Sequence, residues 1–193
     1  LYTNKAASLA RRSGQTTMFT ILKAMTQLLA PVLTFTAEEV WSNLPEWQGK
    51  EASVHMTQFP LVNGQFLNAG LGERWKTLID VKAEISKAIE QARKEKIIGH
   101  SLDALVKLAL PENMCSFLCD HLEDLRALLI VSQLRLVEEK SISNSYISEE
   151  VKGMTVGVEK APGVKCERCW IYAESVGVNK EHPAVCERCL NNL

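Results

Sequence analysis

The sequence predicts a mainly helical chain with a small α/β region in its middle and a ribbon-like four-cysteine module near its C-terminal end. Apolar residues recur at three- and four-residue steps in the first third, apolar and polar residues alternate over 102–110, and four cysteines lie between positions 166 and 189. We therefore expect a partial helical bundle over residues 1–60, a long helix with a small mixed α/β domain over 61–150, and the cysteine module over 151–193.

The composition is that of an ordinary folded protein, and its charge is balanced. The 193 residues are 46% hydrophobic and 23% charged, and 22 basic against 23 acidic side chains give a net charge of −1. A chain-wide positive field is excluded, so binding to a nucleic acid would depend on local basic patches. No apolar stretch reaches the ~20 residues of a membrane span, and no export signal is present. We expect a cytoplasmic location without membrane contact, in a piece of a longer polypeptide.

Two helices are predicted in the first third. The first is expected to end near Ala30, because Pro31 cannot continue a helix. Its apolar face carries Met18, Ile21, Leu22, Met25, Leu28, Leu29 and Val32. The second is expected to begin at Thr36, which has the spacing of a capping box with Glu39, and to bury Trp41 and Leu44. An irregular connector with an extended piece over 53–59 should follow.

A long amphipathic helix is predicted from about Gly72 to Ile97, with Gly99 as its C-terminal cap. Its inward face is expected to carry Trp75, Leu78, Val81, Ile85, Ile89 and Ala92. Its other face alternates in charge and should be solvated; it carries Lys82, Glu84, Lys87, Glu90, Arg93, Lys94, Glu95 and Lys96.

Strands and further helix are predicted beyond the long helix. Period-two alternation indicates a strand over 102–110. Helical spacing returns over 113–129, an extended segment follows over 130–137, and a last short strand is expected over 154–158.

The last four cysteines have the spacing of a metal site. They form the pattern C-x2-C-x16-C-x2-C with Cys166, Cys169, Cys186 and Cys189. Each C-x2-C turn can direct two sulfurs at one ion, and two such turns supply the tetrahedron that suits Zn²⁺. The segment between the pairs is long enough for a hairpin that brings them together. Four thiolates leave no position for water, so we expect one structural zinc ion.

Other uses of the thiols compete with this prediction. Two disulfides would require an oxidising compartment, which nothing in the sequence indicates. A mixed site with His182 also has a finger-like spacing, but it would leave Cys189 unused. Cys115 and Cys119, with His121 nearby, could form a second site, although we expect these two thiols to lie in the core beside leucines.

Several segments together resemble one family of enzymes. They are Ser13–Thr17, Leu29–Trp41, Gly99–Ala104, Leu129–Gln133, Val164–Trp170 and Cys186–Cys189. The first two are similar to the anticodon-binding helical domain of class I aminoacyl-tRNA synthetases of the isoleucine, valine and leucine group. The others are similar to the C-terminal part of the bacterial isoleucyl-tRNA synthetases, and the resemblance covers nearly the whole chain.

The resemblance implies the tRNA-binding part of an isoleucine–tRNA ligase, which attaches isoleucine to its tRNA with ATP. It implies a monomeric enzyme in which ATP binds only in a catalytic domain further upstream in the same polypeptide. Neither the His-x-Gly-His signature nor the Lys-Met-Ser-Lys-Ser loop of that domain occurs in this sequence. We therefore expect no catalytic residue in this chain.

Two groups of residues are expected to contact the anticodon stem-loop of the tRNA. The resemblance points to Arg168 and Trp170 as anticodon contacts, although Trp170 could instead pack over the metal core. The second group is the set of charged residues before Glu38, all of them basic: Lys5, Arg11, Arg12 and Lys23. Such one-sided charge favours a polyanion as the partner over a scattered solvated face.

Two other functions remain open from the sequence. The same cysteine spacing occurs in the zinc finger of a family of DNA glycosylases, although the helices predicted here do not match the rest of those enzymes. A zinc-stapled protein-interaction module, without a nucleic-acid role, is the third possibility. Its binding would be insensitive to salt, whereas contacts to phosphates weaken steeply as salt rises.

Overall fold

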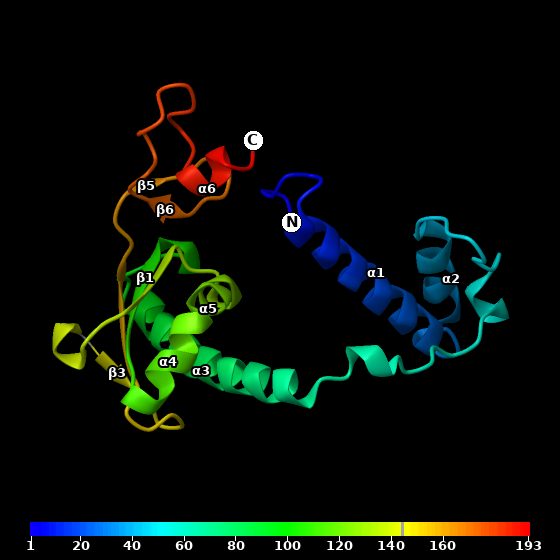
Figure 1. Cartoon of the computed structure of the whole chain (residues 1–193), viewed down its shortest axis with the longest axis horizontal. Helices are drawn as coiled ribbons and strands as arrows, with labels where there is room; N and C mark the ends of the chain where they lie inside the picture. The colour runs from blue at the N-terminus through cyan, green and yellow to red at the C-terminus, as the bar shows by residue number, and fades with distance from the viewer. Residues whose placement is uncertain (144) are drawn as a thin grey trace. The chain divides into compact units, whose positions relative to one another are not determined.

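The computed structural model describes residues 1–143 and 145–193 and separates them into two compact units. The first unit covers Leu1–Leu67 and the second covers Asn68–Leu193, and each is described by itself (Figure 1). The predicted fold class is confirmed, since helices predominate and are accompanied by a small mixed sheet and a C-terminal cluster of four cysteines. The domain boundaries near residues 60 and 150 stay a prediction.

The first unit consists of two helices and two short 3-10 turns. These elements are α1 (Leu9–Leu29), α2 (Thr34–Asn43), η1 (Val54–Met56) and η2 (Gly64–Phe66). Ser8 caps α1, since its hydroxyl accepts the backbone N–H of Arg11 at 3.3 Å. The end of α1 directly before Ala30 confirms the prediction made from Pro31.

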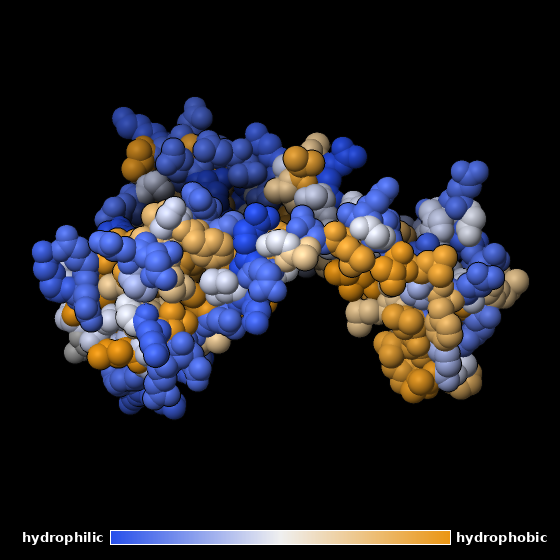
Figure 2. Space-filling view, turned by 60° about the horizontal axis from the view of Figure 1, so that its bottom comes forward, coloured by the Kyte–Doolittle hydropathy of each residue, from blue (hydrophilic) through white to orange (hydrophobic). Residues whose placement is uncertain are grey.

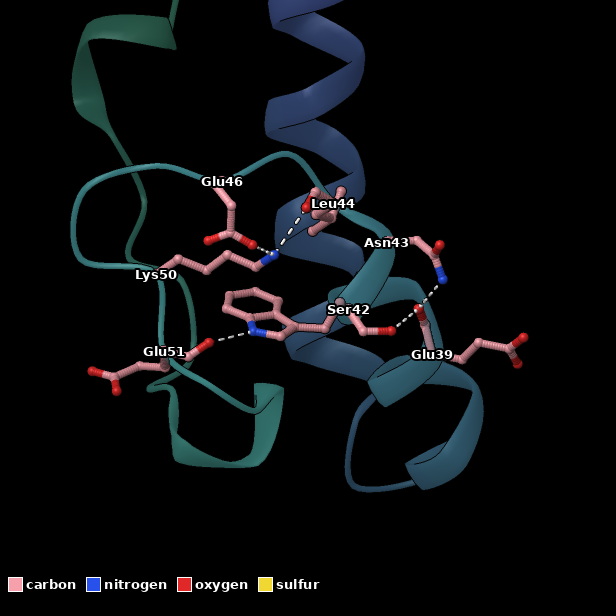
Figure 3. Close-up of polar contacts among 8 residues, drawn as sticks. Glu39, Ser42, Asn43, Leu44, Glu46, Lys50 and Glu51 are labelled. Carbon is pink, nitrogen blue, oxygen red and sulfur yellow. Dashed lines mark hydrogen bonds and ion pairs between the residues drawn. The ribbon is translucent and has the colours of Figure 1, made fainter.

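Trp41 is the centre of the core of the first unit. Its side chain is 1% exposed, and its indole N–H donates to the backbone carbonyl of Glu51 at 2.8 Å (Figure 3). Trp47 meets the Trp41 ring edge to face, with centroids 5.3 Å apart. The Lys50 ammonium lies over the Trp47 ring and donates to the carbonyl of Leu44 at 2.9 Å, which ties the connector to the end of α2. The predicted burial of Trp41 and Leu44 is confirmed.

The start of α2 differs from the prediction. The helix begins two residues before Thr36, and no side chain caps it, so the predicted capping box is wrong. Glu38, next to the predicted capping residue, bonds the connector that follows α2. Its carboxylate accepts the Ser53 hydroxyl at 2.8 Å and the Val54 N–H at 3.1 Å. These bonds hold the connector in the 3-10 turn η1, so the extended piece predicted over 53–59 is wrong as well.

The apolar face predicted for α1 is exposed within the first unit. Figure 2 shows hydrophobic side chains gathered over this part of the chain. The exposed residues of this face are Met18, Ile21, Leu22, Met25, Leu28, Leu29 and Val32. The neighbouring Ala30 instead joins the buried cluster around Trp41. None of the helices within 1–143 and 145–193 combines the length and the apolar character needed to cross a membrane.

Helix α3 (Ala69–Lys94) begins the second unit. Asn68 caps it, since its side chain accepts the N–H of Leu71 at 2.9 Å. The predicted inward positions that are buried are Leu78, Val81, Ile85, Ile89 and Ala92. Trp75 is 39% exposed, which corrects its predicted inward position, because the part of α3 that is buried begins only at Leu78.

The end of α3 is capped by Lys96 rather than by Gly99. Lys96 adopts a left-handed conformation with φ of 61°, and the N–H of Ile97 reaches back to the carbonyl of Ala92 at 2.9 Å. The helix is therefore closed three residues before the predicted glycine. Gly99 instead donates its N–H to the carboxylate of Asp103 at 3.2 Å.

The second unit is built around a four-stranded sheet with the order β2-β1-β4-β3. Its elements are β1 (Ala104–Ala109), α4 (Glu112–Asp120), α5 (Leu122–Leu129), β2 (Gln133–Leu136), β3 (Ser145–Ile147) and β4 (Thr155–Lys160), with 3-10 turns at Ser101–Asp103 and Glu139–Ser141. Strands β1 and β2 are parallel, with α4 and α5 as the crossover that a parallel pair requires. Strand β4 is antiparallel to both β1 and β3. Helices α3 and α5 contact each other and the sheet, and their apolar side chains form one core with it.

Two predicted segments are shorter or interrupted in the structure, and one strand is additional to the prediction. The helix predicted over 113–129 is divided at His121, whose backbone leaves the helical region. The extended segment predicted from Ile130 begins only at Gln133, because Ile130 takes the left-handed conformation that ends α5. Strand β3 was not predicted, since its three residues carry no long alternation.

Glu84 corrects the prediction of a solvated charged face on α3. Its side chain is buried, and one carboxylate oxygen accepts hydrogen bonds from the Tyr146 hydroxyl at 3.2 Å, the Ser148 hydroxyl at 2.6 Å and the backbone N–H of Glu149 at 3.2 Å. The other oxygen pairs with the Lys87 ammonium at 2.5 Å. The bonds from Lys87 and Ser148 outweigh the effect of burial and lower the pKa of Glu84 to about 2.

We expect the free energy of unfolding to depend on pH through Glu84. Its pKa is lower in the folded state than the ordinary value of 4.5, so its stabilisation is full above pH 4.5 and is lost as the pH falls from 4.5 toward about 2. Glu84→Gln should lower the free energy of unfolding at pH 7 by about 1–3 kcal/mol, because a charged acceptor is lost from a buried network. Urea unfolding followed by circular dichroism between pH 2 and 7 measures both effects.

Glu90→Gln is the matched control, since Glu90 lies on the same helix and pairs with Arg93 at the surface. An exposed ion pair contributes at most about 1 kcal/mol, so this variant should retain the pH dependence of the natural protein. Equal behaviour of the two variants would contradict the role assigned to Glu84.

Candidate zinc centre and nucleic-acid interface

Two small elements of the second unit hold the two cysteine pairs. The first pair lies in the turn between the antiparallel strands β5 (Val164–Lys165) and β6 (Tyr172–Ala173). The second pair lies at the start of α6 (Glu187–Leu190). Gly163 allows the chain to enter β5 close to β6, because its φ is +95° and a Cβ there would lie 2.4 Å from the backbone carbon of Ala173.

The four sulfur atoms form a cluster of the size that zinc requires. They all lie within 4.8 Å of one another, and those of Cys169 and Cys186 are 3.6 Å apart. Zinc–sulfur bonds of about 2.3 Å in a tetrahedron place neighbouring sulfurs about 3.8 Å apart. Cys166, Cys186 and Cys189 are buried, and Cys169 is half-buried. The donor set therefore fits one zinc ion held by sulfur alone.

The electrostatics of the cluster favour a cation. Burial raises the pKa of Cys166, but the backbone N–H groups of Cys169, Cys186 and Arg168 outweigh it and lower that pKa to about 6. Burial, and then the nearby sulfur of Cys169, raise the pKa of Cys186 and of Cys189. Four thiols at this distance cannot all ionise without a cation, so binding of a divalent ion would release protons and remove the repulsion.

The described residues do not form the alternative arrangements that the sequence left open for the thiols. His182 is exposed, and the metal-sized cluster found among the described residues contains only cysteines. The predicted hairpin surrounds the first cysteine pair rather than joining the two pairs, since residues 174–185 form a loop. Cys115 is half-buried, but Cys119 is exposed at the end of α4, so its predicted core position is wrong.

Two polar side chains where β2 begins fasten the cysteine module to the sheet. The Ser132 hydroxyl donates to the carbonyl of Leu102 and accepts the N–H of Tyr172 at 2.7 Å. The Gln133 amide donates to the carbonyls of Pro162 at 3.2 Å and Tyr172 at 3.5 Å. The sequence pointed to these two residues only as part of a segment that resembles a family, and it did not predict their bonds. No spacing pattern indicates a hydrogen bond across 29 to 40 positions.

The structure gives Arg168 and Trp170 different surroundings. The Arg168 guanidinium is half-buried and donates through one nitrogen to the carbonyls of Cys189 at 2.9 Å and Asn192 at 3.0 Å. Trp170 is 61% exposed, with a left-handed φ of 66°, and the Lys165 ammonium lies 5.8 Å from its ring centre. The Trp170 ring is therefore presented to solvent instead of covering the sulfur cluster.

Three of the four predicted basic residues of the first unit lie at the beginning of α1, whereas Lys23 lies further along the helix, with its ammonium 4.9 Å from the centre of the Trp47 ring. Lys5 precedes the helix, and Arg11 and Arg12 stand in its first turn. Lys5 and Arg12 are exposed, and Arg11 is half-buried and donates to the carbonyl of Asn4 at 3.4 Å. Their contact with a tRNA stays a prediction.

Models of two known protein families match parts of this chain. A model of the anticodon-binding domain of tRNA ligases matches residues 1–109, more than half of the sequence. The chain belongs to this family. A second model, of the zinc finger found in FPG and IleRS, matches residues 163–192, which include all four clustered cysteines.

Three relatives of this chain share one name. The chain is 44% identical over 188 residues to the isoleucine–tRNA ligase of Geobacter sulfurreducens and 46% identical over 191 residues to that of Syntrophotalea carbinolica. The match to the isoleucine–tRNA ligase of Caldanaerobacter subterraneus is 41% identical over 196 residues. These matches cover 97%, 98% and 100% of this chain but only 20%, 20% and 21% of the relatives. The resemblance identified in the sequence is confirmed.

The comparisons also decide between the open alternatives. The zinc-finger description names both FPG and IleRS, so that match alone does not separate two kinds of protein. The anticodon-binding match and the isoleucine–tRNA ligases that span nearly the whole chain favour the tRNA-ligase interpretation over a glycosylase-like finger or a protein-interaction module.

We expect the purified chain to carry one Zn²⁺ bound by four sulfurs. Cys189→Ser, or removal of the metal with a chelator, should unfold residues 163–193, because about 10 kcal/mol or more of binding free energy is coupled to the folding of this module. The four-stranded sheet and the first unit should stay folded. Elemental analysis, X-ray absorption and hydrogen exchange measure the metal content, its ligands and the extent of unfolding.

Cys119→Ser and His182→Ala are the matched controls for this experiment. Both side chains are exposed, and both lie outside the sulfur cluster. Each variant should keep its zinc and its fold. A nitrogen ligand in the absorption spectrum, or loss of zinc from His182→Ala, would show that the mixed site is correct instead.

Proposed function

We propose that this chain is the anticodon-binding, zinc-containing part of an isoleucine–tRNA ligase, and that it holds the anticodon stem-loop of an isoleucine-accepting tRNA. The observation that carries the proposal is the succession, in one chain, of an anticodon-binding domain and an IleRS-type zinc finger with four converging cysteines. Isoleucine–tRNA ligases whose similarity spans nearly the whole chain support it.

The whole enzyme would join isoleucine to its tRNA with ATP, in a catalytic domain that belongs to the rest of the polypeptide. In this chain the zinc ligands Cys166, Cys169, Cys186 and Cys189 would hold the fold of the module. Zinc with four sulfur ligands has no open position, so its contribution is to shape a binding surface. We expect the enzyme to act as a monomer in the cytoplasm.

Trp170 is the residue best suited to an unpaired anticodon base. Unpaired bases stack on aromatic rings, and the exposed indole of Trp170 offers such a ring. The ammonium of Lys165 beside it could meet a phosphate of the same nucleotide. Arg168 anchors the end of α6 through one nitrogen, and its guanidinium has further N–H donors for a phosphate or a base edge.

The basic start of α1 would supply further phosphate contacts. Lys5, Arg11 and Arg12 belong to a stretch that contains basic side chains and no acidic one before Glu38, so the formal charge of this stretch is positive. Contacts of this kind add affinity without sequence preference and position the tRNA.

Trp170 and Arg168 should contribute to tRNA binding through different forces. Stacking on one base contributes ~1–3 kcal/mol and carries no charge, so Trp170→Ala should weaken binding about tenfold or more and leave the salt slope unchanged. Arg168→Ala should flatten that slope by about one unit, because a phosphate contact releases counterions. Titration of a fluorescent anticodon stem-loop RNA between 50 and about 200 mM salt measures both quantities.

Trp75→Ala is the matched control, since Trp75 is another partly exposed tryptophan of the second unit. It should bind the RNA as the natural chain does. The melting temperature and zinc content of every variant have to be measured, because Arg168 also bonds two backbone carbonyls. If Trp170→Ala melts early while its folded fraction binds normally, the stacking role is wrong.

The chain by itself should show no ATP–pyrophosphate exchange with isoleucine. Both nucleotide signatures of the catalytic domain are missing from the sequence, so no group is available to bind ATP and activate an amino acid. Exchange is measured with radiolabelled pyrophosphate, with an intact isoleucine–tRNA ligase as the positive control. Exchange that stays with the chain through several chromatographic steps would contradict the assignment.

A further inference from the structure

An open groove lies in the second unit where the sheet meets the zinc module. Its volume is about 680 Å³, and one wall comes from α5 and the start of β2. The other wall comes from β6, the loop after it and α6. The groove therefore lies along the junction between the four-stranded sheet and the zinc module. Along the chain, these two parts are connected by the turn after β4.

Three arginines from three different elements line this groove. They are Arg126 of α5, Arg135 of β2 and Arg188 of α6. Two carboxylates, Glu123 and Glu174, lie there as well. The chain as a whole has a net charge of −1, so the excess of one positive charge in a single groove is a local feature rather than a property of the surface at large.

Two of these arginines, Arg126 and Arg135, are held in place by neighbouring side chains. Glu123 accepts two bonds from Arg126, at 3.0 Å from Nε and 2.7 Å from Nη2, which leaves the other N–H groups of this guanidinium for a second partner. Arg135 donates to the side-chain oxygen of Gln133 at 2.7 Å. The same Gln133 uses its amide nitrogen to bond the backbone of Pro162 and of Tyr172.

Gln133 therefore does two things with one side chain. It fixes the zinc module against the sheet, and it orients an arginine into the groove between them. Ser132 strengthens the same junction through its bond from the N–H of Tyr172. Groups that are fixed before a ligand arrives lose less conformational entropy on binding. This preorganisation is expected of a binding site and not of scattered surface arginines.

We propose that this groove binds the phosphodiester backbone of the tRNA, with Arg126 and Arg135 as its phosphate contacts. This inference rests on the proposed function, because it takes a tRNA as the partner. Planar guanidinium groups match phosphate oxygens with two parallel bonds, which favours a polyphosphate over an apolar partner. The module that carries Trp170 also supplies one wall of the groove, so one RNA hairpin would place a base on the ring and its backbone along the arginines.

The test uses the full, zinc-loaded chain and a synthetic RNA hairpin with the anticodon stem and loop of an isoleucine tRNA. The double variant Arg126→Gln, Arg135→Gln should bind about tenfold more weakly at 0.1 M salt. Its salt slope should be flatter by between about one and two units, because up to two phosphate contacts are lost. Fluorescence anisotropy at several salt concentrations measures both values.

A second variant changes affinity in the opposite direction. Glu174→Gln removes a negative charge from the groove wall and should tighten binding about twofold, a gain that misfolding cannot imitate. Arg93→Gln is the matched control, because Arg93 pairs with Glu90 three positions away, as Arg126 does with Glu123, but lies on α3. It should bind the hairpin as the natural chain does.

The outcomes separate this inference from the proposed function. If the natural chain binds the hairpin and the double variant binds it equally well, the groove is not a phosphate site and the proposed function stands. Equal losses in Arg93→Gln and the double variant would show diffuse attraction and overturn the groove as well. If the natural chain fails to bind the hairpin at 50 mM salt, both are wrong.

Discussion

Four thiols confined to one small cluster are the constraint on which the C-terminal part of this protein depends. Beyond the cysteines, its core has only a few apolar side chains, among them Ile171, Val176 and Val185. So small a core cannot offset the conformational entropy of about thirty residues, and the free energy of zinc binding has to supply the difference. That ion would hold the β5–β6 turn and the start of α6 together, and the surface that they present would depend on it.

The zinc module is placed by hydrogen bonds rather than by a second apolar core. Ser132 and Gln133 satisfy backbone groups of Leu102, Pro162 and Tyr172, which lie on both sides of the junction. Buried or half-buried bonds of this kind fix geometry strongly, because any other orientation would leave polar groups without partners. The exposed ring of Trp170 and the arginines of the groove are therefore held by the same junction.

Much of the fold was predictable from local pattern. The end of α1, the buried face of α3 and the strands β1 and β4 follow from residue periodicity and from Pro31, because helix and strand periods are local properties. The errors share one cause. The positions of Glu84 and Trp75 were predicted from their places along a helix, whereas their burial depends on segments that pack there from far along the chain or on the limit of that packing. The bonds of Glu38 could not be predicted for the same reason, because its donors, Ser53 and Val54, lie 15 and 16 positions away.

The sequence alone was enough to predict the family and which four cysteines come together, because a C-x2-C turn brings its two sulfurs close whatever the rest of the chain does, and because the family's motifs are contiguous. Only the tertiary structure decided what surrounds these cysteines. In the tertiary structure the Trp170 ring is exposed, and Arg168 bonds the carbonyls of Cys189 and Asn192. Arg126, Arg135 and Arg188 come from three different elements and line one groove. Residues this far apart in sequence share no local period, so their meeting is set by chain topology and by the hydrogen bonds that lock it.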